Sequence, residues 1–294
     1  MTGSSGLVGT ALRKAMAASG WSVTRIVRPS SATTAAGSLV WEPGAGTIDG
    51  AGLEGHDAVL HLAGESLAGI WTPSKKRRIE DSRVRGTELL ARTLAGLRSK
   101  PGVLVSWSGV DYYGDRATPV TEDDAPGDSF LARVCVRWET AARPAADAGI
   151  RLVNVRSGLV LSRDGGLIAT ILPIFRLGLG APFGSGRQPW PWITLSDMVG
   201  VALHAIGHDA MAGPVNAVAP GRVDHETFTL ALARAVGRPV LFRIPAWAAR
   251  LAPGGMADEM LLAGAPVVPR RLEQTGFAFR WPDLEPALKH MFGR

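Results

Sequence analysis

Three glycines at three-residue spacing lie at the start of the chain, in "MTGSSGLVGT" at residues 1–10. They are Gly3, Gly6 and Gly9, and a helical pattern with one apolar face continues over residues 8–16. A glycine-rich turn that begins a helix lets main-chain N–H groups bind the phosphates of a dinucleotide. The motif alone is a weak signal because the chain holds 36 glycines, so its meaning depends on the elements downstream of it.

Apolar runs typical of buried strands alternate with helical patterns over the first two thirds of the chain. The strand-like runs lie at residues 21–27, around Val40, and at 58–64, 102–108 and 150–156, and the helical patterns at 8–16, 72–97 and 131–149. This alternation predicts an α/β fold with a Rossmann-type, doubly wound parallel sheet that helices cover on both faces.

The pattern changes after Gly158, where a stretch rich in glycine, proline and tryptophan begins, and the alternation weakens from about Gly221. We expect a small C-terminal α/β domain on the substrate side of the sheet. The predicted dinucleotide-binding domain spans residues 1–160, with 193–220 returning to it, and the C-terminal domain spans 161–192 and 221–294.

No strand precedes the first glycine, although a dinucleotide-binding turn normally comes directly after one. A parallel sheet without its central first strand would leave ladder groups of its neighbours unpaired. We therefore expect the natural polypeptide to start several residues upstream, with Met1 marking a mis-assigned start. Mass spectrometry of the native N-terminus is the test of this expectation.

The composition is that of a globular protein, with 46% apolar and 20% charged residues among 294. No uninterrupted apolar run approaches the roughly 20 residues of a membrane helix, so we expect no membrane partner. The single cysteine, Cys135, cannot form an internal disulfide, and the chain does not start with a secretory signal. These features predict a cytoplasmic protein.

The formal net charge is +6, carried mostly by arginine, which indicates an anionic ligand or nucleic acid. The densest basic run, "KKRR" at residues 75–78, has no interleaved aromatic residues of the kind that stack on bases. A solvated helix face therefore explains this run better than nucleic-acid binding does. We expect a small-molecule substrate as partner, and a homodimer stays open.

The strand-like run at residues 21–27 leads into "IVRPSS" at residues 26–31. In a dinucleotide-binding fold, an acidic residue here accepts the ribose 2′-hydroxyl, whereas an arginine accommodates a 2′-phosphate. Arg28, together with Ser30 and Ser31, favours NADP(H) over NAD(H). A solvated arginine at a strand end is the alternative interpretation.

Eight motifs across nearly the whole chain occur in the order of a known family. They are "TGSSGLVG", "LHLAGESLAG", "WTPSKKRRIEDSRVRGTELL", "SWSGVDYYGD", "FLARVCVRWE", "RSGLVLSRDGG", "GSGRQPWPWITLSD" and "VPRRLEQTGFAFRWPDLEPAL". By these motifs the chain resembles atypical extended members of the short-chain dehydrogenase/reductase superfamily. More narrowly, it resembles epimerase-family proteins with a small C-terminal domain of unknown function, of the DUF1731 type.

The resemblance implies which residues bind the coenzyme. It places the pyrophosphate against Gly3, Ser4, Gly6, Leu7 and Val8, the adenosine ribose against Arg28, the adenosine and nicotinamide ribose against Leu62, Ala63 and Gly64, and the nicotinamide end near Arg156 and Gly158.

Enzymes of this superfamily usually transfer a hydride, with a tyrosine as acid/base, a lysine four residues later and a serine that orients the substrate carbonyl. Ser108 matches the serine. The tyrosine and lysine positions fall on Leu131 and Cys135, so the usual pair is missing. The lysine matters because an unperturbed phenol, with a pKa of about 10, is protonated at neutral pH.

Other residues are candidates for the missing proton chemistry. Tyr113, in the loop after Ser108, is a candidate general acid, and the alternative is that it packs beside the coenzyme. Arg116 can polarise a phenol but cannot act as a base. Cys135 lies between two valines on a helix, which favours a core residue over a nucleophile.

Four residues are candidate substrate contacts. The family resemblance suggests that Arg83 points into the active site, where it and Glu65 either bind a polar substrate or pair with each other. Arg187 and Trp190 lie beside the expected substrate cleft, and with Trp192 they either form a flat apolar pocket with a cationic end or wedge the two domains together. We expect no metal site, because His204 and His208 lack acidic or cysteine partners.

Two functions therefore remain open. One is an NADP(H)-binding epimerase or oxidoreductase that acts on a small carbonyl or hydroxyl compound without the Tyr-x-x-x-Lys pair. The other is a non-catalytic NADP(H)-binding sensor or interaction protein. Leu131 and Cys135 favour the sensor, whereas Ser108, Arg83 and the tryptophan-rich segment favour the enzyme.

Overall fold

The computed structural model describes residues 1–29, 37–251 and 254–293. Its central sheet has four parallel strands in the order β4 (Ala58–His61), β5 (Val103–Gly109), β6 (Arg151–Ser157) and β9 (Gly213–Ala217). A second sheet contains β1 (Ile26–Val27), β2 (Leu39–Glu42) and β3 (Thr47–Ile48), in which β1 and β2 are parallel and β3 is antiparallel. The parallel α/β architecture confirms the predicted fold class.

The first two residues lie between these two sheets. The Thr2 N–H donates to the Leu60 carbonyl at 3.0 Å, and the Met1 carbonyl accepts from the Ile26 N–H at 2.8 Å. Thr2 thereby makes a parallel bridge to His61, at the place where the end of a first strand belongs. Among the described residues, Met1 and Thr2 are the segment that joins β1 to β4. The strand predicted at residues 21–27 pairs only at its last two residues.

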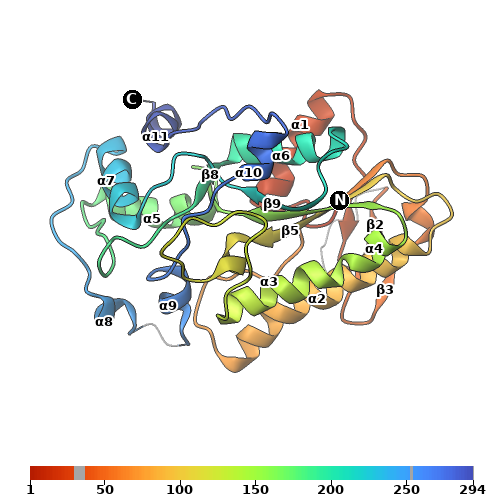
Figure 1. The fold of residues 1–294 in the computed structure, drawn as a ribbon, viewed down its shortest axis with the longest axis horizontal. Coiled ribbons are helices and arrows are strands. Elements are labelled where there is room, and N and C mark those ends of the chain that lie inside the picture. Colours follow the sequence, from red (N-terminus) through yellow and green to blue (C-terminus); the bar gives the residue numbers. More distant parts are fainter. Residues whose placement is uncertain (30–36, 252–253, 294) are drawn as a thin grey trace.

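Helices cover both faces of the sheet (Figure 1). On one face lie α2 (Pro73–Ala95), α3 (Phe130–Ala141) and α4 (Arg143–Asp147), and on the other α1 (Leu7–Ala18), α6 (Leu195–Gly207) and α10 (Arg270–Gln274). Leu12 and Met16 of α1 and Leu90 and Leu94 of α2 are buried against the sheet, as their helical spacing predicts.

Local sequence sets the ends of the helices that border the site. The Thr72 hydroxyl accepts from the Lys75 N–H at 3.2 Å, and a proline occupies the first turn of α2, so the predicted start of this helix is confirmed. The helix expected over residues 131–149 is interrupted instead, because Pro144 has no N–H to continue the ladder. The chain therefore forms α3 and α4 as separate helices.

A second apolar core is formed by elements from the later part of the chain. A short parallel pair, β7 (Leu159–Leu161) and β8 (Trp192–Thr194), lies next to α5 (Gly166–Arg176), α7 (His225–Ala235) and α11 (Leu284–Phe292), and these share one apolar core. Two short helices, α8 (Ala246–Ala249) and α9 (Met256–Met260), come after α7. The 3-10 turns η1 (Ala51–Leu53) and η2 (Val110–Tyr113) complete the elements.

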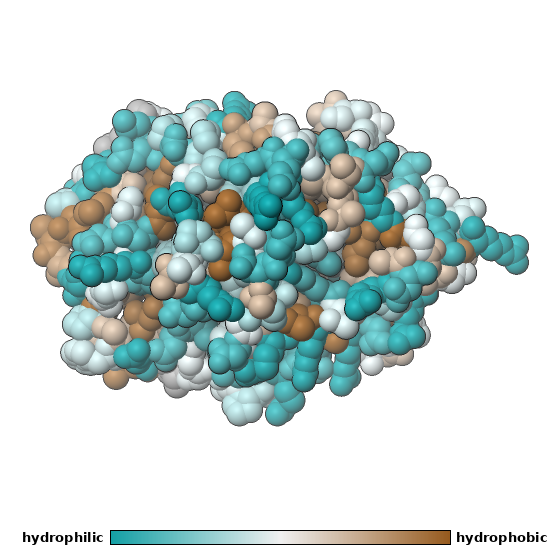
Figure 2. All heavy atoms as spheres, viewed as in Figure 1, coloured by the Kyte–Doolittle hydropathy of each residue, from teal (hydrophilic) through white to brown (hydrophobic). Residues whose placement is uncertain are grey.

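The outer surface in the view of Figure 2 is mostly hydrophilic, with apolar side chains gathered at the end of the molecule that holds α5 and α7. Within the described ranges, the helices are all too short or too polar to cross a lipid bilayer.

Candidate functional site

The glycine turn is packed so tightly that side chains are excluded at two of its glycines. Gly3 has a φ of 61°, and a Cβ there would lie 2.7 Å from the Leu62 carbonyl carbon. A Cβ on Gly9 would lie 2.3 Å from the Gly3 carbonyl oxygen, whereas one on Gly6 would meet nothing closer than 3.4 Å. No side chain caps α1 among the described residues, so its first N–H groups remain available to an anion. This geometry fits the diphosphate of a dinucleotide.

The segment after β4 lies directly against this turn. The Thr2 hydroxyl accepts from the N–H groups of Leu62 and Ala63, at 3.1 and 3.3 Å, and holds this segment against the turn. A Cβ on Gly64 would lie 3.4 Å from the guanidinium carbon of Arg83. The structure thus brings the predicted pyrophosphate and ribose segments and Arg83 to one place.

Arg28 is exposed just after β1. The Lys75 hydrogen bond, together with the weaker charge effects of Lys75, Arg78 and Arg28, holds the pKa of Glu65 below its usual value, so the Arg28 charge acts on this site. Ser30 and Ser31, which accompany Arg28 in the sequence, lie outside the described residues.

An ion pair between Glu65 and Arg83, one of the two alternatives for these residues, does not form. Arg83 donates to the carbonyl oxygens of Glu65 and Ile79, at 3.0 and 3.1 Å, and its guanidinium lies over the Trp138 ring. The Glu65 carboxylate pairs with Lys75 at 2.8 Å. Lys75, expected on a solvated face, is therefore part of the candidate site, and the interpretation of "KKRR" as wholly solvated is wrong at this position.

A buried hydrogen-bonded chain begins at Ser108. Its hydroxyl donates to Glu139 at 2.9 Å, and Arg156 holds both oxygens of that carboxylate, at 2.8 and 2.9 Å. Arg156 also donates to the Tyr113 hydroxyl at 2.8 Å, and Tyr113 donates to the Asn216 side-chain oxygen at 2.7 Å. The register that pairs Ser108 with Arg156 across β5 and β6 brings these side chains together.

This chain of hydrogen bonds occupies the polar atoms of two predicted site residues. Tyr113 is fully buried, and burial raises its pKa to about 12. Arg156 is bound by Glu139 and lies with its guanidinium carbon 3.4 Å from the centre of the Tyr112 ring. The general-acid role of Tyr113 and the coenzyme contact of Arg156 stay predictions, and both require groups that are already hydrogen-bonded inside the protein.

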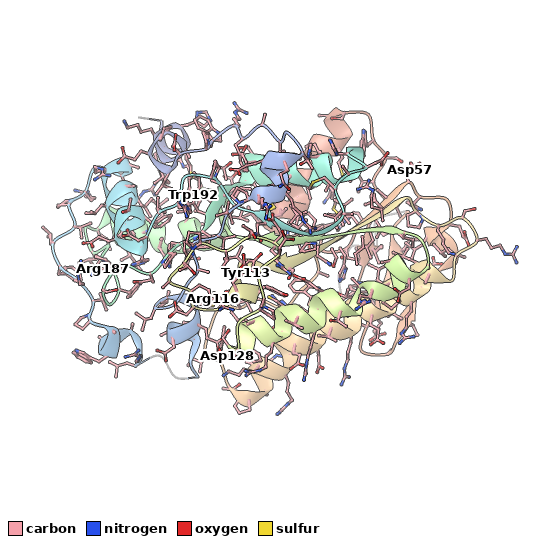
Figure 3. The ribbon with its side chains drawn as sticks, in the orientation of Figure 1. Asp57, Tyr113, Arg116, Asp128, Arg187 and Trp192 are labelled. Carbon is pink, nitrogen blue, oxygen red and sulfur yellow. The ribbon has the colours of Figure 1, made fainter. Side chains whose placement is uncertain are left out.

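Arg116 does not polarise a phenol. Its Nε donates to the Tyr113 carbonyl at 3.1 Å, and its Nη2 donates to the carbonyls of Ala125 and Pro126. Figure 3 shows Arg116 and Tyr113 near the centre of the molecule. The guanidinium thus ties the loop after β5 to the segment that leads into α3.

Arg187 and Trp190 lie in different surroundings. Arg187 is exposed and lies well to one side of Tyr113 in Figure 3. Trp190 is buried, with its ring centre 4.3 Å from that of His225. Trp192 donates to the Gly221 carbonyl. The tryptophans therefore pack within a core, as the wedge alternative expects, and the contact of Arg187 and Trp190 with a substrate stays a prediction.

Gly158 is enclosed by protein at the end of β6. A Cβ there would lie 2.8 Å from Val218 and 2.9 Å from the Pro191 carbonyl oxygen. The close approach of these segments explains why a glycine stands at this position, and the contact of Gly158 with the nicotinamide end stays a prediction.

The positions of the missing tyrosine and lysine are sealed by protein. Leu131 is buried, and its N–H and that of Phe130 donate to the Glu259 carboxylate of α9, at 2.8 and 3.1 Å. Cys135 is buried, and burial raises its pKa to about 12, which makes it a core residue and not a thiolate. Sequence patterns did not reveal Glu259, because nothing in "MADEM" ties it to a helix more than a hundred residues earlier.

The rings of His204 and His208 contact each other with their centres 4.8 Å apart and their planes tilted by 35°, and His204 also bonds to Thr275. In the part of the chain that the structure describes, no three histidine, cysteine, aspartate or glutamate side chains gather as metal ligands would.

Comparison with known proteins agrees with this geometry. A family model described as "NAD dependent epimerase/dehydratase family" matches residues 1–218, and one described as "Domain of unknown function (DUF1731)" matches residues 244–291. An epimerase family protein of Mycobacterium bovis is 41% identical over 98% of this chain and 95% of its own length. The human epimerase family protein SDR39U1 is 35% identical over 98% of this chain and 97% of its own length.

The solved structures give the same result. The crystal structure of human SDR39U1 with NADPH matches with a TM-score of 0.89 and 34% identity, over 100% of this chain and 98% of that chain. A nucleoside-diphosphate sugar epimerase from Corynebacterium glutamicum matches with a TM-score of 0.82 and 33% identity, over 99% of this chain and 57% of that chain. The chain therefore belongs to the NAD dependent epimerase/dehydratase family and carries the DUF1731 domain at its C-terminal end.

Proposed function

We propose that this protein binds NADP(H) on the turn from Gly3 to Val8 and acts on a small carbonyl or hydroxyl compound as an oxidoreductase or epimerase. The observation that carries the proposal is the uncapped start of α1, held by glycines that exclude side chains and packed against Leu62. The human relative crystallised with NADPH supports the same choice of coenzyme. When bound, the nicotinamide supplies or accepts a hydride.

In this proposal, different residues of the chain bind the coenzyme and orient the substrate. The N–H groups of the first turn of α1 bind the diphosphate, and Arg28 binds a 2′-phosphate. The Ser108 hydroxyl, whose hydrogen goes to Glu139, offers its oxygen lone pairs to a substrate hydroxyl. Glu65, Lys75 and Arg83 present charge beside the ribose segment and orient a polar substrate. The cytoplasmic location and a homodimer remain predictions.

A second candidate, the non-catalytic NADP(H) sensor, is favoured by one observation. Leu131 and Cys135 are buried at the places of the usual proton-transfer pair. A sensor binds NADPH but does not consume it.

Tryptophan fluorescence and a carbonyl screen separate the two functions. Titration of the protein with NADPH and NADH is expected to show tighter binding of NADPH, and Arg28→Ala is expected to remove that preference. Consumption of NADPH in the presence of a panel of aldehydes, ketones and quinones supports the enzyme. Tight NADPH binding without consumption across the panel supports the sensor, and no binding overturns both.

A further inference from the structure

Asp111 is a carboxylic acid in the candidate site that no sequence motif singles out. It lies in η2, three residues after Ser108, and its side chain turns back onto the end of β5. A Cβ built on Gly109 would lie 2.8 Å from Asp111 Oδ2 and 3.7 Å from Cys135 Sγ. The carboxyl group therefore lies beside the thiol that occupies the usual lysine position.

The surroundings of the Asp111 carboxyl lack an ionic partner. Across the ranges that the structure covers, no side chain donates a hydrogen bond to it and no cation pairs with it. The charged or titratable groups that act on it are Arg83 from α2, Cys135 from α3 and Glu259 from α9. Arg83 is already bound by two carbonyl oxygens. From β6, Arg156 is neutralised by Glu139.

These surroundings favour the neutral acid over the carboxylate. Burial, the largest influence, raises the pKa of Asp111, and the charge of Glu259 acts in the same direction. The hydrogen bond from the backbone N–H of Asp111 and the charge of Arg83 lower the pKa, and each is weaker than burial but stronger than the effect of Glu259. A lysine ammonium at position 135 would ionise this group, whereas the buried Cys135 thiol is uncharged. The loss of the usual lysine and the raised pKa of Asp111 are thus physically linked.

We propose that Asp111 is the general acid of this site and donates its proton to the oxygen of a bound carbonyl compound. The proposal rests on the proposed function, in which the nicotinamide supplies the hydride. The carbonyl carbon gains the hydride with its electron pair, the π pair of the C=O bond moves to oxygen, and this oxygen takes the Asp111 proton. Water then returns a proton to the carboxylate, and the reverse sequence oxidises an alcohol.

Neither neighbouring hydroxyl can take this role as arranged. Ser108 gives its hydrogen to Glu139, and Tyr113 is fully buried and gives its hydrogen to Asn216. Asp111 lies on the same loop, no described side chain bonds to its carboxyl group, and in this proposal it supplies the proton.

A direct test needs no substrate. The protein labelled with ¹³C at aspartate carboxyl carbons is titrated by NMR, and the Asp111 resonance is assigned by its absence in Asp111→Asn. We expect it to titrate above the ordinary aspartate pKa of 3.8, in the direction that a general acid at neutral pH requires. Asp115→Asn is the matched control, because Asp115 lies in the same loop, is exposed and bonds to the Gly264 N–H. Titration of Asp111 at or below its ordinary pKa overturns the proposal.

The second test measures NADPH oxidation with phenanthrenequinone as a carbonyl probe. Asp111→Asn keeps the shape but cannot release a proton, so we expect kcat to fall by about 100-fold or more with little change in KM or in NADPH binding. Asp111→Glu is expected to restore part of kcat, and Asp115→Asn to leave it unchanged. Wild-type kcat in Asp111→Asn overturns the proposal. A wild-type protein that does not bind NADPH contradicts the proposed function instead, while the NMR titration still reports on Asp111.

Discussion

The pairing of Arg156 with Glu139 shows how much of the site depends on one buried charge. The side chains are 3% and 13% exposed, so replacing Glu139 by glutamine leaves a guanidinium charge inside the protein. We expect Glu139→Gln to lower the free energy of unfolding by about 3–5 kcal/mol in urea denaturation. Asp81→Asn, which breaks the exposed Asp81–Arg85 pair, is the control, with an expected loss below about 1 kcal/mol. Equal losses in both variants would contradict this account.

Two buried histidines make the stability of the protein depend on pH. Burial lowers the pKa of His61 from 6.5 to about 3, and its two ring nitrogens bond to Thr2 and Thr87. Burial also lowers the pKa of His225, to about 4. The unfolded chain binds protons at these residues below pH 6.5 whereas the folded protein does not, so stability falls as pH falls.

As the pH falls below 6.5, each histidine is expected to lower the free energy of unfolding by up to about 1.4 kcal/mol per pH unit. This decrease ends when the pH reaches the pKa of that histidine in the folded protein. Urea denaturation at a series of pH values in this window measures it. His225→Asn is expected to reduce the slope, and a stability that does not change across the window would show that His61 and His225 are not buried as neutral groups.

At the scale of elements, α9 fixes the start of α3. Two N–H groups of the first turn of α3 donate to the Glu259 carboxylate, while the Ser129 hydroxyl accepts a third, from Ala132. We expect Glu259→Gln to lower stability by about 1–2 kcal/mol and to speed hydrogen exchange at Phe130 and Leu131. Asp258→Asn is the matched control, because Asp258 pairs with Arg250 on the surface. Unchanged exchange at α3 in Glu259→Gln would show that α9 does not hold this helix.

The same elements show what the sequence could and could not predict. The parallel strands and α2 were predictable, because apolar periodicity, Thr72 and Pro73 are local signals. The sequence could not predict the Glu139–Arg156 pair, the Glu259 cap or the burial of the Asp111 carboxyl group. Each of these depends on contacts between residues that are far apart in the chain and meet at the end of the sheet. Tyr113 was found as a candidate from its motif, but its bond to Asn216 depends on the place of β9 beside β6.

At the scale of the whole molecule, the C-terminal segment completes cores that begin in the first half of the chain. Leu272 of α10 is fully buried in the core formed with the central sheet and α6. Val267 packs with Tyr113, and the Asp197 carboxylate of α6 accepts the N–H groups of Arg280 and Trp281 at 2.8 and 3.0 Å. These contacts predict one cooperative unfolding transition for the protein.

Leu272→Ala tests this cooperativity. Removal of a fully buried leucine is expected to lower the free energy of unfolding by about 2–5 kcal/mol. Because α10 packs into the core of the central sheet, near-ultraviolet circular dichroism and hydrogen exchange at α6 and α11 should move together to the new midpoint. Separate transitions, with α11 lost before α6, would mean that the C-terminal domain unfolds on its own. A coincident shift would instead mean that the C-terminal domain unfolds only together with the sheet that holds Ser108 and the loop that holds Asp111.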